Sequence, residues 1–112
     1  MSFGRDLIIP ETGKVSVEVK GHSGTGTKGN DIICAGISAL FQTLVLSVSR
    51  ILKIEQDIER DSSGFMSSEI EIDSLNKDDL NRLKLLIESF ILGASEISRE
   101  YPGTVKIDIE RH

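Results

Sequence analysis

Cysteine, proline and tryptophan are scarce in this sequence. Its 112 residues include one cysteine, two prolines and no tryptophan, and aromatic residues make up 4% of the chain. The single cysteine, Cys34, excludes an intramolecular disulfide framework and a structural zinc site made of several thiolates. This cysteine content indicates a reducing compartment, the cytoplasm, and the small number of aromatic residues predicts an aliphatic core.

Basic residues are also in short supply. Lysine and arginine number 13 against 18 aspartates and glutamates, which gives a formal net charge of −5. A general nucleic-acid binder needs a basic surface to neutralise phosphates, so the charge balance excludes that class. The length fits a single domain over residues 1–112. Residues 1–10 lack the apolar run and cleavage site of a secretory signal.

One long stretch of the chain carries no formal charge. Residues 32–49 are uncharged, which reaches the lower length limit of a membrane helix. Polar side chains, among them Ser38, Gln42 and Thr43, are nevertheless spread along this stretch. We therefore interpret it as a buried helix of a globular domain and expect no membrane association.

Hydrophobic periodicity predicts an α+β fold. Valines at 15, 17 and 19 alternate with polar residues, as in a strand with one buried face, and a short apolar run at 7–9 predicts a hairpin partner for it. The other expected elements are a helix from Asn30 or Asp31 to about Leu52, a hairpin within 55–73, an amphipathic helix over 76–101 and a strand over 105–110. The expected architecture is two helices packed on one face of a mainly antiparallel, mixed sheet of about five strands.

The only cysteine and one of the two histidines flank a glycine-rich segment. If Asp31 caps the following helix, Cys34 lies in its first turn, where unpaired amides and the helix dipole favour a thiolate. His22 leaves the preceding strand and is a candidate general acid and base. Three alternatives stay open: Cys34 as a small buried hydrophobe, His22 as a turn residue, and a metal site made from both with Asp31.

Residues 21–29 contain four glycines and predict a loop. This loop is either a lid or clamp over a substrate, or only a flexible connection between strand and helix. Ser38 follows Cys34 by one helical turn on the same face, where it either lines the site or packs in the core. The candidate substrate-binding residues are therefore Gly21, Ser23, Gly24, Gly26, Gly29 and Ser38.

Two segments of the sequence resemble a known family. Residues 21–23 read Gly-His-Ser, and residues 29–40 read Gly-Asn-Asp-Ile-Ile-Cys-Ala-Gly-Ile-Ser-Ala-Leu. Together they resemble the signature of the ribosomal-processing cysteine protease (Prp) family. The resemblance continues through residues 42–44, the second amphipathic helix and the Glu-Tyr-Pro at 100–102. Ser23 is a departure, since the family typically has alanine there.

This resemblance implies a cytoplasmic bacterial endopeptidase that removes a short N-terminal extension from a large-subunit ribosomal protein. It implies Cys34 as nucleophile, His22 as general base, and Asp31 as an orienter of the histidine or a helix cap. It also implies a homodimer without metal or cofactor, and the acidic charge suits a basic protein substrate. The alternatives are a non-catalytic ribosome-assembly or peptide-binding module and a metal-dependent hydrolase.

Overall fold

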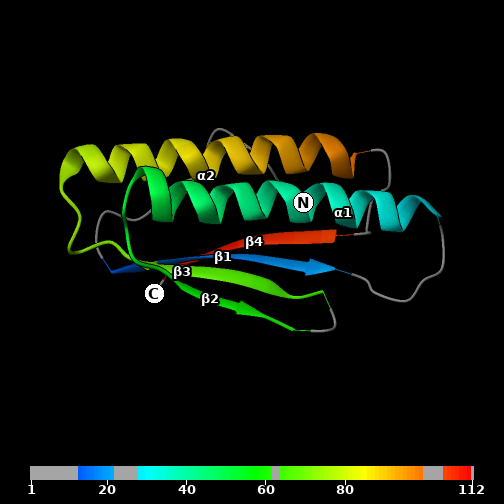
Figure 1. Ribbon diagram of the computed structural model, residues 1–112, viewed down its shortest axis with the longest axis horizontal. Coiled ribbons are helices and arrows are strands. Elements are labelled where there is room, and N and C mark those ends of the chain that lie inside the picture. The colour runs from blue at the N-terminus through cyan, green and yellow to red at the C-terminus, as the bar shows by residue number, and fades with distance from the viewer. Residues whose placement is uncertain (1–12, 22–27, 62–63, 100–104, 112) are drawn as a thin grey trace.

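A computed structural model describes residues 13–21, 28–61, 64–99 and 105–111 of the chain. Two helices lie on one side of a four-stranded sheet (Figure 1). The elements in chain order are β1 (Lys14–Gly21), α1 (Lys28–Leu46), its π-helical continuation η1 (Ser47–Ile51), β2 (Asp57–Arg60), β3 (Met66–Glu71), α2 (Lys77–Ser98) and β4 (Val105–Arg111). The prediction of an α+β domain with two helices on a sheet is confirmed.

The sheet has the strand order β2-β3-β1-β4, and each pair of neighbours is antiparallel. Val15, Val17 and Val19 of β1 are buried toward the helices, as their alternation predicted. The described sheet has four strands where about five were expected. The predicted strand at residues 7–9 lies outside the described residues.

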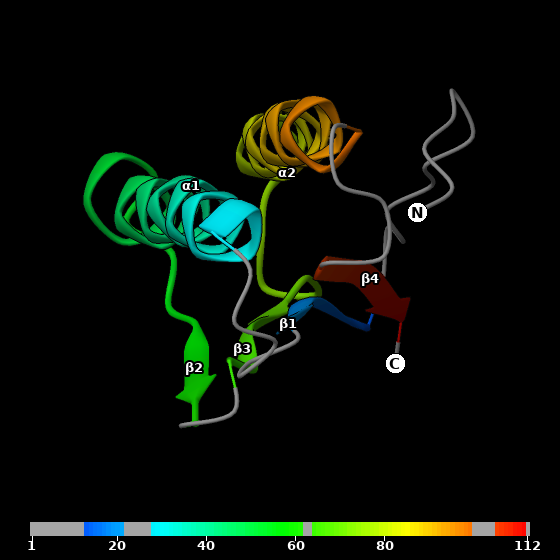
Figure 2. The same ribbon diagram turned by 90° about the vertical axis from the view of Figure 1, so that its right-hand side faces the viewer.

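The two helices cover different halves of the sheet. Figure 2 shows α1 above the β2–β3 half and α2 above the β1–β4 half. Their contact is close because it includes glycines: a Cβ atom added to Gly36 would lie 3.3 Å from Cδ1 of Ile97, and one added to Gly93 would lie 3.2 Å from Cδ1 of Leu40. Phe41 and Phe90 join the two helices at a ring-centroid distance of 5.9 Å.

The start of α2 follows the sequence prediction. The side chain of Asn76 accepts a hydrogen bond from the backbone N–H of Asp79 at 2.8 Å, so Asn76 is the N-cap. Asp78 and Asp79 occupy the first turn, where carboxylates interact favourably with the positive end of the helix dipole. This helix is therefore defined by local capping as well as by its apolar face.

The uncharged segment, residues 32–49, forms a helix that contributes side chains to the hydrophobic core. Ile32–Ile51 is long and apolar enough to cross a membrane by length and composition. Ile37, Phe41 and Val48 on this helix are at most 1% exposed and belong to the same cluster as the buried valines of β1. A core helix of a globular domain passes the same composition test, and this packing supports that interpretation.

Candidate active site

Cys34 lies on the second turn of α1. The helix begins at Lys28, three residues before Asp31. The prediction that the helix begins at Asn30 or Asp31, with Cys34 in its first turn, is therefore wrong. Extending an existing helix by one residue costs far less than starting one, so residues 28–30 join the helix although a capping residue follows them. Within the described helix, the backbone amides without an acceptor in the helical ladder consequently belong to residues 28–30, and the amide of Cys34 lies within the ladder.

The flank of α1 that carries Cys34 faces away from α2. Gly36 and Leu40 contact α2, and Cys34 and Ser38 are each about 200° around the helix from Gly36. Both side chains are partly exposed, and Cys34 is a free thiol that packs against the edge of the core. Cys34 and Ser38 thus share one partly exposed flank of α1. This helix lies above the β2–β3 half of the sheet (Figure 2).

The end of β1 lies at the same end of the molecule as the start of α1 (Figure 1). Gly21, the last residue of β1, pairs with Val105 at the start of β4. His22, Ser23, Gly24 and Gly26 lie outside the described residues, as do the side-chain positions of Asp31 and its neighbours in the first turn. The topology therefore delivers the residue before His22 to the end of the domain that carries Cys34.

The described residues contain no cluster of side chains that could hold a metal ion. Among residues 13–21, 28–61, 64–99 and 105–111, no three side chains of His, Cys, Asp or Glu lie close enough to hold one ion. The partly exposed thiol and hydroxyl on α1 remain the chemically reactive groups of this flank. Their arrangement fits nucleophilic chemistry at sulfur.

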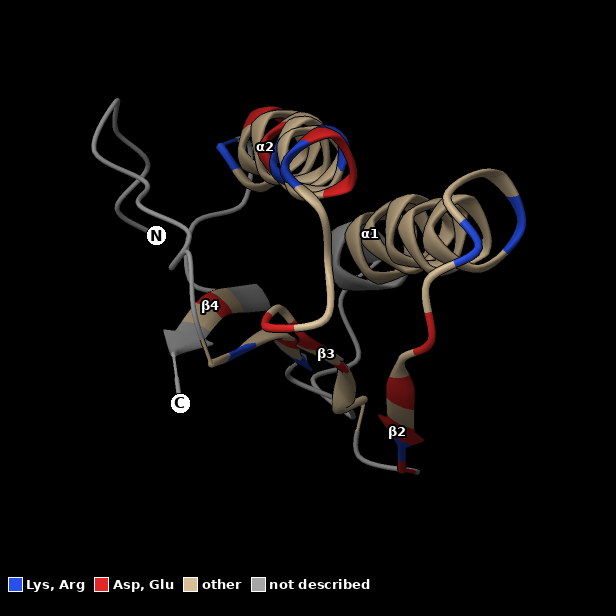
Figure 3. Ribbon diagram, turned by 90° about the vertical axis from the view of Figure 1, so that its left-hand side faces the viewer, with Lys and Arg blue, Asp and Glu red and all other residues tan. Residues whose placement is uncertain are grey.

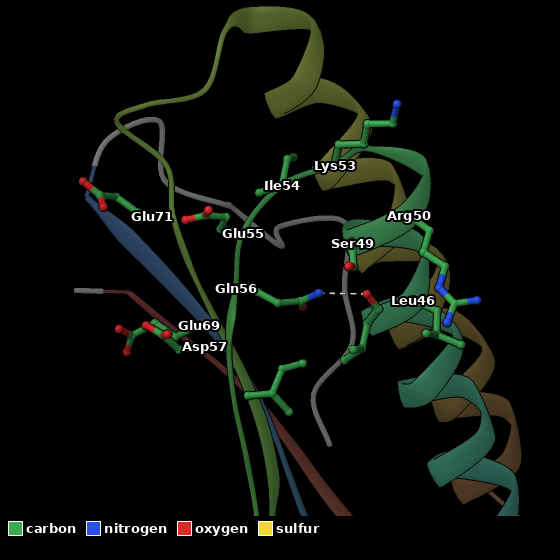
Figure 4. Close-up of a pocket in the computed structure, with 12 residues that line it drawn as sticks. Leu46, Ser49, Arg50, Lys53, Ile54, Glu55, Gln56, Asp57, Glu69 and Glu71 are labelled. Atoms are coloured by element: carbon green, nitrogen blue, oxygen red, sulfur yellow. Dashed lines mark hydrogen bonds between the residues drawn. The ribbon is translucent and has the colours of Figure 1, made fainter.

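A separate pocket of about 710 Å³ lies at the other end of the uncharged helix, and Cys34 does not line it. Figure 4 shows Arg50 and Lys53 on its helical side and acidic residues on its strand side. At its centre, Nε2 of Gln56 donates to the carbonyl oxygen of Val45 at 2.8 Å, and Oε1 accepts from Oγ of Ser68 at 2.6 Å. The sequence analysis did not identify this pocket. The sequence feature that could have identified its basic side is the pair Arg50 and Lys53, which follows the uncharged residues 32–49.

Charge is unevenly distributed over the described surface. Figure 3 shows acidic residues on β2 and β3 and basic residues near the end of η1. β2 is an edge strand whose four residues are all exposed. Asp57 and Glu59 therefore place negative charge along one edge of the sheet, and Glu55 precedes this strand in the chain.

Known proteins are similar to this chain both in sequence and in fold. Ribosomal processing cysteine protease Prp from Staphylococcus aureus is 26% identical over 104 residues, which cover 92% of this chain and 94% of that protein. Its counterpart from Bacillus subtilis is 29% identical over 99 residues, which cover 87% of each chain. Crystal structures of an S. aureus Prp with a substrate peptide and with a covalently linked product peptide give TM-scores of 0.64 and 0.61, at 23% and 25% identity. Each covers 80% of this chain and 81% of the S. aureus chain.

The family model for cysteine protease Prp matches residues 8–106. This range contains β1, the glycine-rich connection, the Cys34 turn of α1 and α2. Since the match spans both predicted motifs and nearly all of the described fold, the chain belongs to the cysteine protease Prp family.

Proposed function

We propose that this chain is a cysteine endopeptidase that removes the N-terminal extension of a large-subunit bacterial ribosomal protein during ribosome maturation. The observation that carries the proposal is the family match over residues 8–106, which includes the Gly-His and Asp-Ile-Ile-Cys-Ala motifs. The two relatives are named ribosomal processing cysteine proteases. Solved structures of S. aureus Prp contain a substrate peptide and a covalently linked product peptide, which supports a peptide substrate.

In the proposed mechanism, the Sγ of Cys34 attacks the scissile carbonyl. His22 takes the thiol proton and then gives it to the leaving amine, so that the peptide bond breaks and a thioester forms. A water molecule, deprotonated by His22, hydrolyses the thioester and regenerates the thiol. Because helical side chains lean toward the N-terminus, the sulfur lies over the preceding turn, and the amides of residues 28–30 are the oxyanion donors that α1 offers.

Other residues have supporting roles in this proposal. Ser38 lines the site on the same flank as Cys34, and Asp31 orients His22. Gly21, Ser23, Gly24, Gly26 and Gly29 shape the clamp over the extended substrate peptide. The active form is a cytoplasmic homodimer that uses no metal or cofactor. The family match favours this enzyme over the non-catalytic peptide-binding module that the sequence also allowed.

The test uses the N-terminally extended ribosomal protein of the host, with cleavage followed by mass spectrometry. Cys34→Ala and His22→Ala are each expected to lower kcat/KM on the order of a thousandfold or more, because both groups form or break bonds in the transition state. His112→Ala is the matched control, since the chain has two histidines, and its cleavage rate is expected to stay normal. Circular dichroism establishes that each variant folds. Normal cleavage by folded Cys34→Ala would falsify the proposal.

A further inference from the structure

The face of the sheet that points away from the helices contains a hollow of about 490 Å³, which the proposed chemistry at Cys34 does not use. Two serines form its floor: Ser16 of β1 is 4% exposed and Ser67 of β3 is 7% exposed. Both serines line the hollow, and neither hydroxyl is among the buried side-chain atoms that lack a hydrogen-bond partner, so each faces the open space. A hydroxyl that faces an open hollow can both donate and accept a hydrogen bond, so the floor of the hollow offers two polar contacts to a ligand.

The strand register arranges acidic side chains around these serines. On this face of the sheet, one row across the strands pairs Glu59 with Ser67 and Ser67 with Glu18. The next row pairs Asp57 with Glu69 and Glu69 with Ser16. We call this set of six residues the serine hollow. Its short serine side chains stand between longer acidic ones, which produces the depression.

The serine hollow has an excess of negative charge. Asp57 lies directly opposite Glu69, and like charges at such a position repel one another. Lys14 approaches Glu69 with an Nζ–Oε1 distance of 3.7 Å, and Lys20 approaches Glu18 at the same distance. Among the ion pairs of the described residues, none includes Asp57 or Glu59. The side of the hollow formed by β2 is thus left without a compensating cation in this part of the structure.

The charge and the lining of the hollow restrict the kind of ligand that it can bind. An anion would be repelled by the carboxylates. A single metal ion has no described set of three ligating side chains close enough to hold it. Phe65 and Ile58 line the hollow as well, and they offer an apolar surface to the methylene stem of a lysine or arginine. An extended segment with several cationic side chains satisfies the acids, the serines and the apolar surface together.

We propose that the serine hollow binds a lysine- and arginine-rich segment of the protein substrate, at a distance from the scissile bond. This inference rests on the proposed function, because it assigns to the protease a second contact with its basic substrate. One cationic side chain enters the hollow and donates hydrogen bonds to Ser16, Ser67 and the neighbouring carboxylates. Further cations along the segment contact Asp57 and Glu59 on the exposed edge strand.

Binding at this surface acts before the chemical step. Opposite charges accelerate encounter and keep the substrate bound to the enzyme, and salt weakens both effects. The serine hollow therefore lowers KM for a substrate with a basic segment and leaves kcat unchanged. A short peptide that contains only the cleavage site gains nothing from it.

The experiment measures binding of fluorescein-labelled hexalysine by anisotropy at low salt. The protein is the full chain carrying Cys34→Ala, and hexalysine contains no cleavage site, so the result is independent of catalysis. Adding Asp57→Asn with Glu59→Gln is expected to weaken binding about tenfold through loss of two carboxylate contacts. Glu88→Gln with Glu96→Gln on α2 removes the same charge elsewhere and is expected to change the Kd less than about twofold. Equal weakening in both double variants, or no measurable binding by the Cys34→Ala protein, overturns the proposal.

A second variant tests the shape of the hollow without changing charge. Ser67→Val fills the floor with a residue that strands favour. It is expected to weaken hexalysine binding severalfold while the melting temperature stays within a few degrees. In the enzyme with Cys34 intact, the Asp57→Asn and Glu59→Gln pair is expected to raise KM for the extended ribosomal protein and to leave cleavage of a short peptide normal. A folded Ser67→Val protein with unchanged binding counts against the hollow. If the enzyme with Cys34 intact fails to cleave the ribosomal protein, the proposed function is contradicted, whereas the hexalysine measurement still tests the hollow by itself.

Discussion

The side chain of Gln56 connects the end of α1 to strand β3 through two hydrogen bonds. Its Nε2 donates to the carbonyl oxygen of Val45 at 2.8 Å, and its Oε1 accepts from Oγ of Ser68 at 2.6 Å. Ser68 is 1% exposed and donates its hydroxyl to Gln56, so removal of the Gln56 side chain leaves this hydroxyl without its protein partner. Gln56→Ala is therefore expected to lower the free energy of unfolding by about 2–6 kcal/mol. That sum combines about 0.5–1.5 kcal/mol for each hydrogen bond with about 1–3 kcal/mol for the stranded hydroxyl.

A urea titration followed by circular dichroism measures this loss, and the melting temperature should fall on the order of 10 °C. Ser68→Ala supplies the control. In that background no hydroxyl is left unpaired, so Gln56→Ala is expected to cost about 1–2 kcal/mol less than in the original chain. A cost below about 0.5 kcal/mol, or costs that simply add in the double variant, would refute the assignment of Gln56 as a buried bridge.

Two further substitutions test the helices. Phe41→Ala empties a fully buried position beside Phe90 and is expected to cost about 3–5 kcal/mol in a denaturant titration; a cost near 1 kcal/mol would contradict its central place in the core. Asn76→Ala removes the side chain that caps α2 through the Asp79 amide and is expected to cost about 1 kcal/mol by thermal unfolding. Asn81→Ala, in the exposed part of the same helix, is its control and should be neutral or slightly stabilising; equal effects at both positions would exclude the cap.

Local patterns in the sequence predicted most of the described elements. The alternation of Val15, Val17 and Val19 predicted β1, and the capping residue with its following acids predicted the start of α2. The turn signal around Gly64 also agrees with the structure, where this residue has a φ of 95° between the paired strands β2 and β3. These features follow from the sequence because each depends on neighbouring residues alone.

The start of the core helix was the clearest error. Asp31 has the side chain of a capping residue, yet α1 begins at Lys28. Its change to the π-helical η1 and the link from Gln56 to Ser68 were also not predicted. The early helix start reflects the low cost of extending a helix that already exists, whereas the link from Gln56 to Ser68 joins segments that are distant along the chain. Hydrophobic periodicity carries no information about either effect.

For the candidate active site and the serine hollow as well, some features follow from the sequence and others only from the tertiary structure. The sequence by itself determined the single thiol, the glycine-rich connection and the family to which both motifs point. Helical spacing already placed Cys34 and Ser38 on one face, and only the tertiary structure decided that this face is partly exposed. The tertiary structure also decided that Ser16 is buried although it belongs to the polar side of its strand. The physical reason is that a sequence specifies which face of a strand is polar. Which polar side chains then stand next to one another depends on strand order and register, and these arise from the packing of the whole domain.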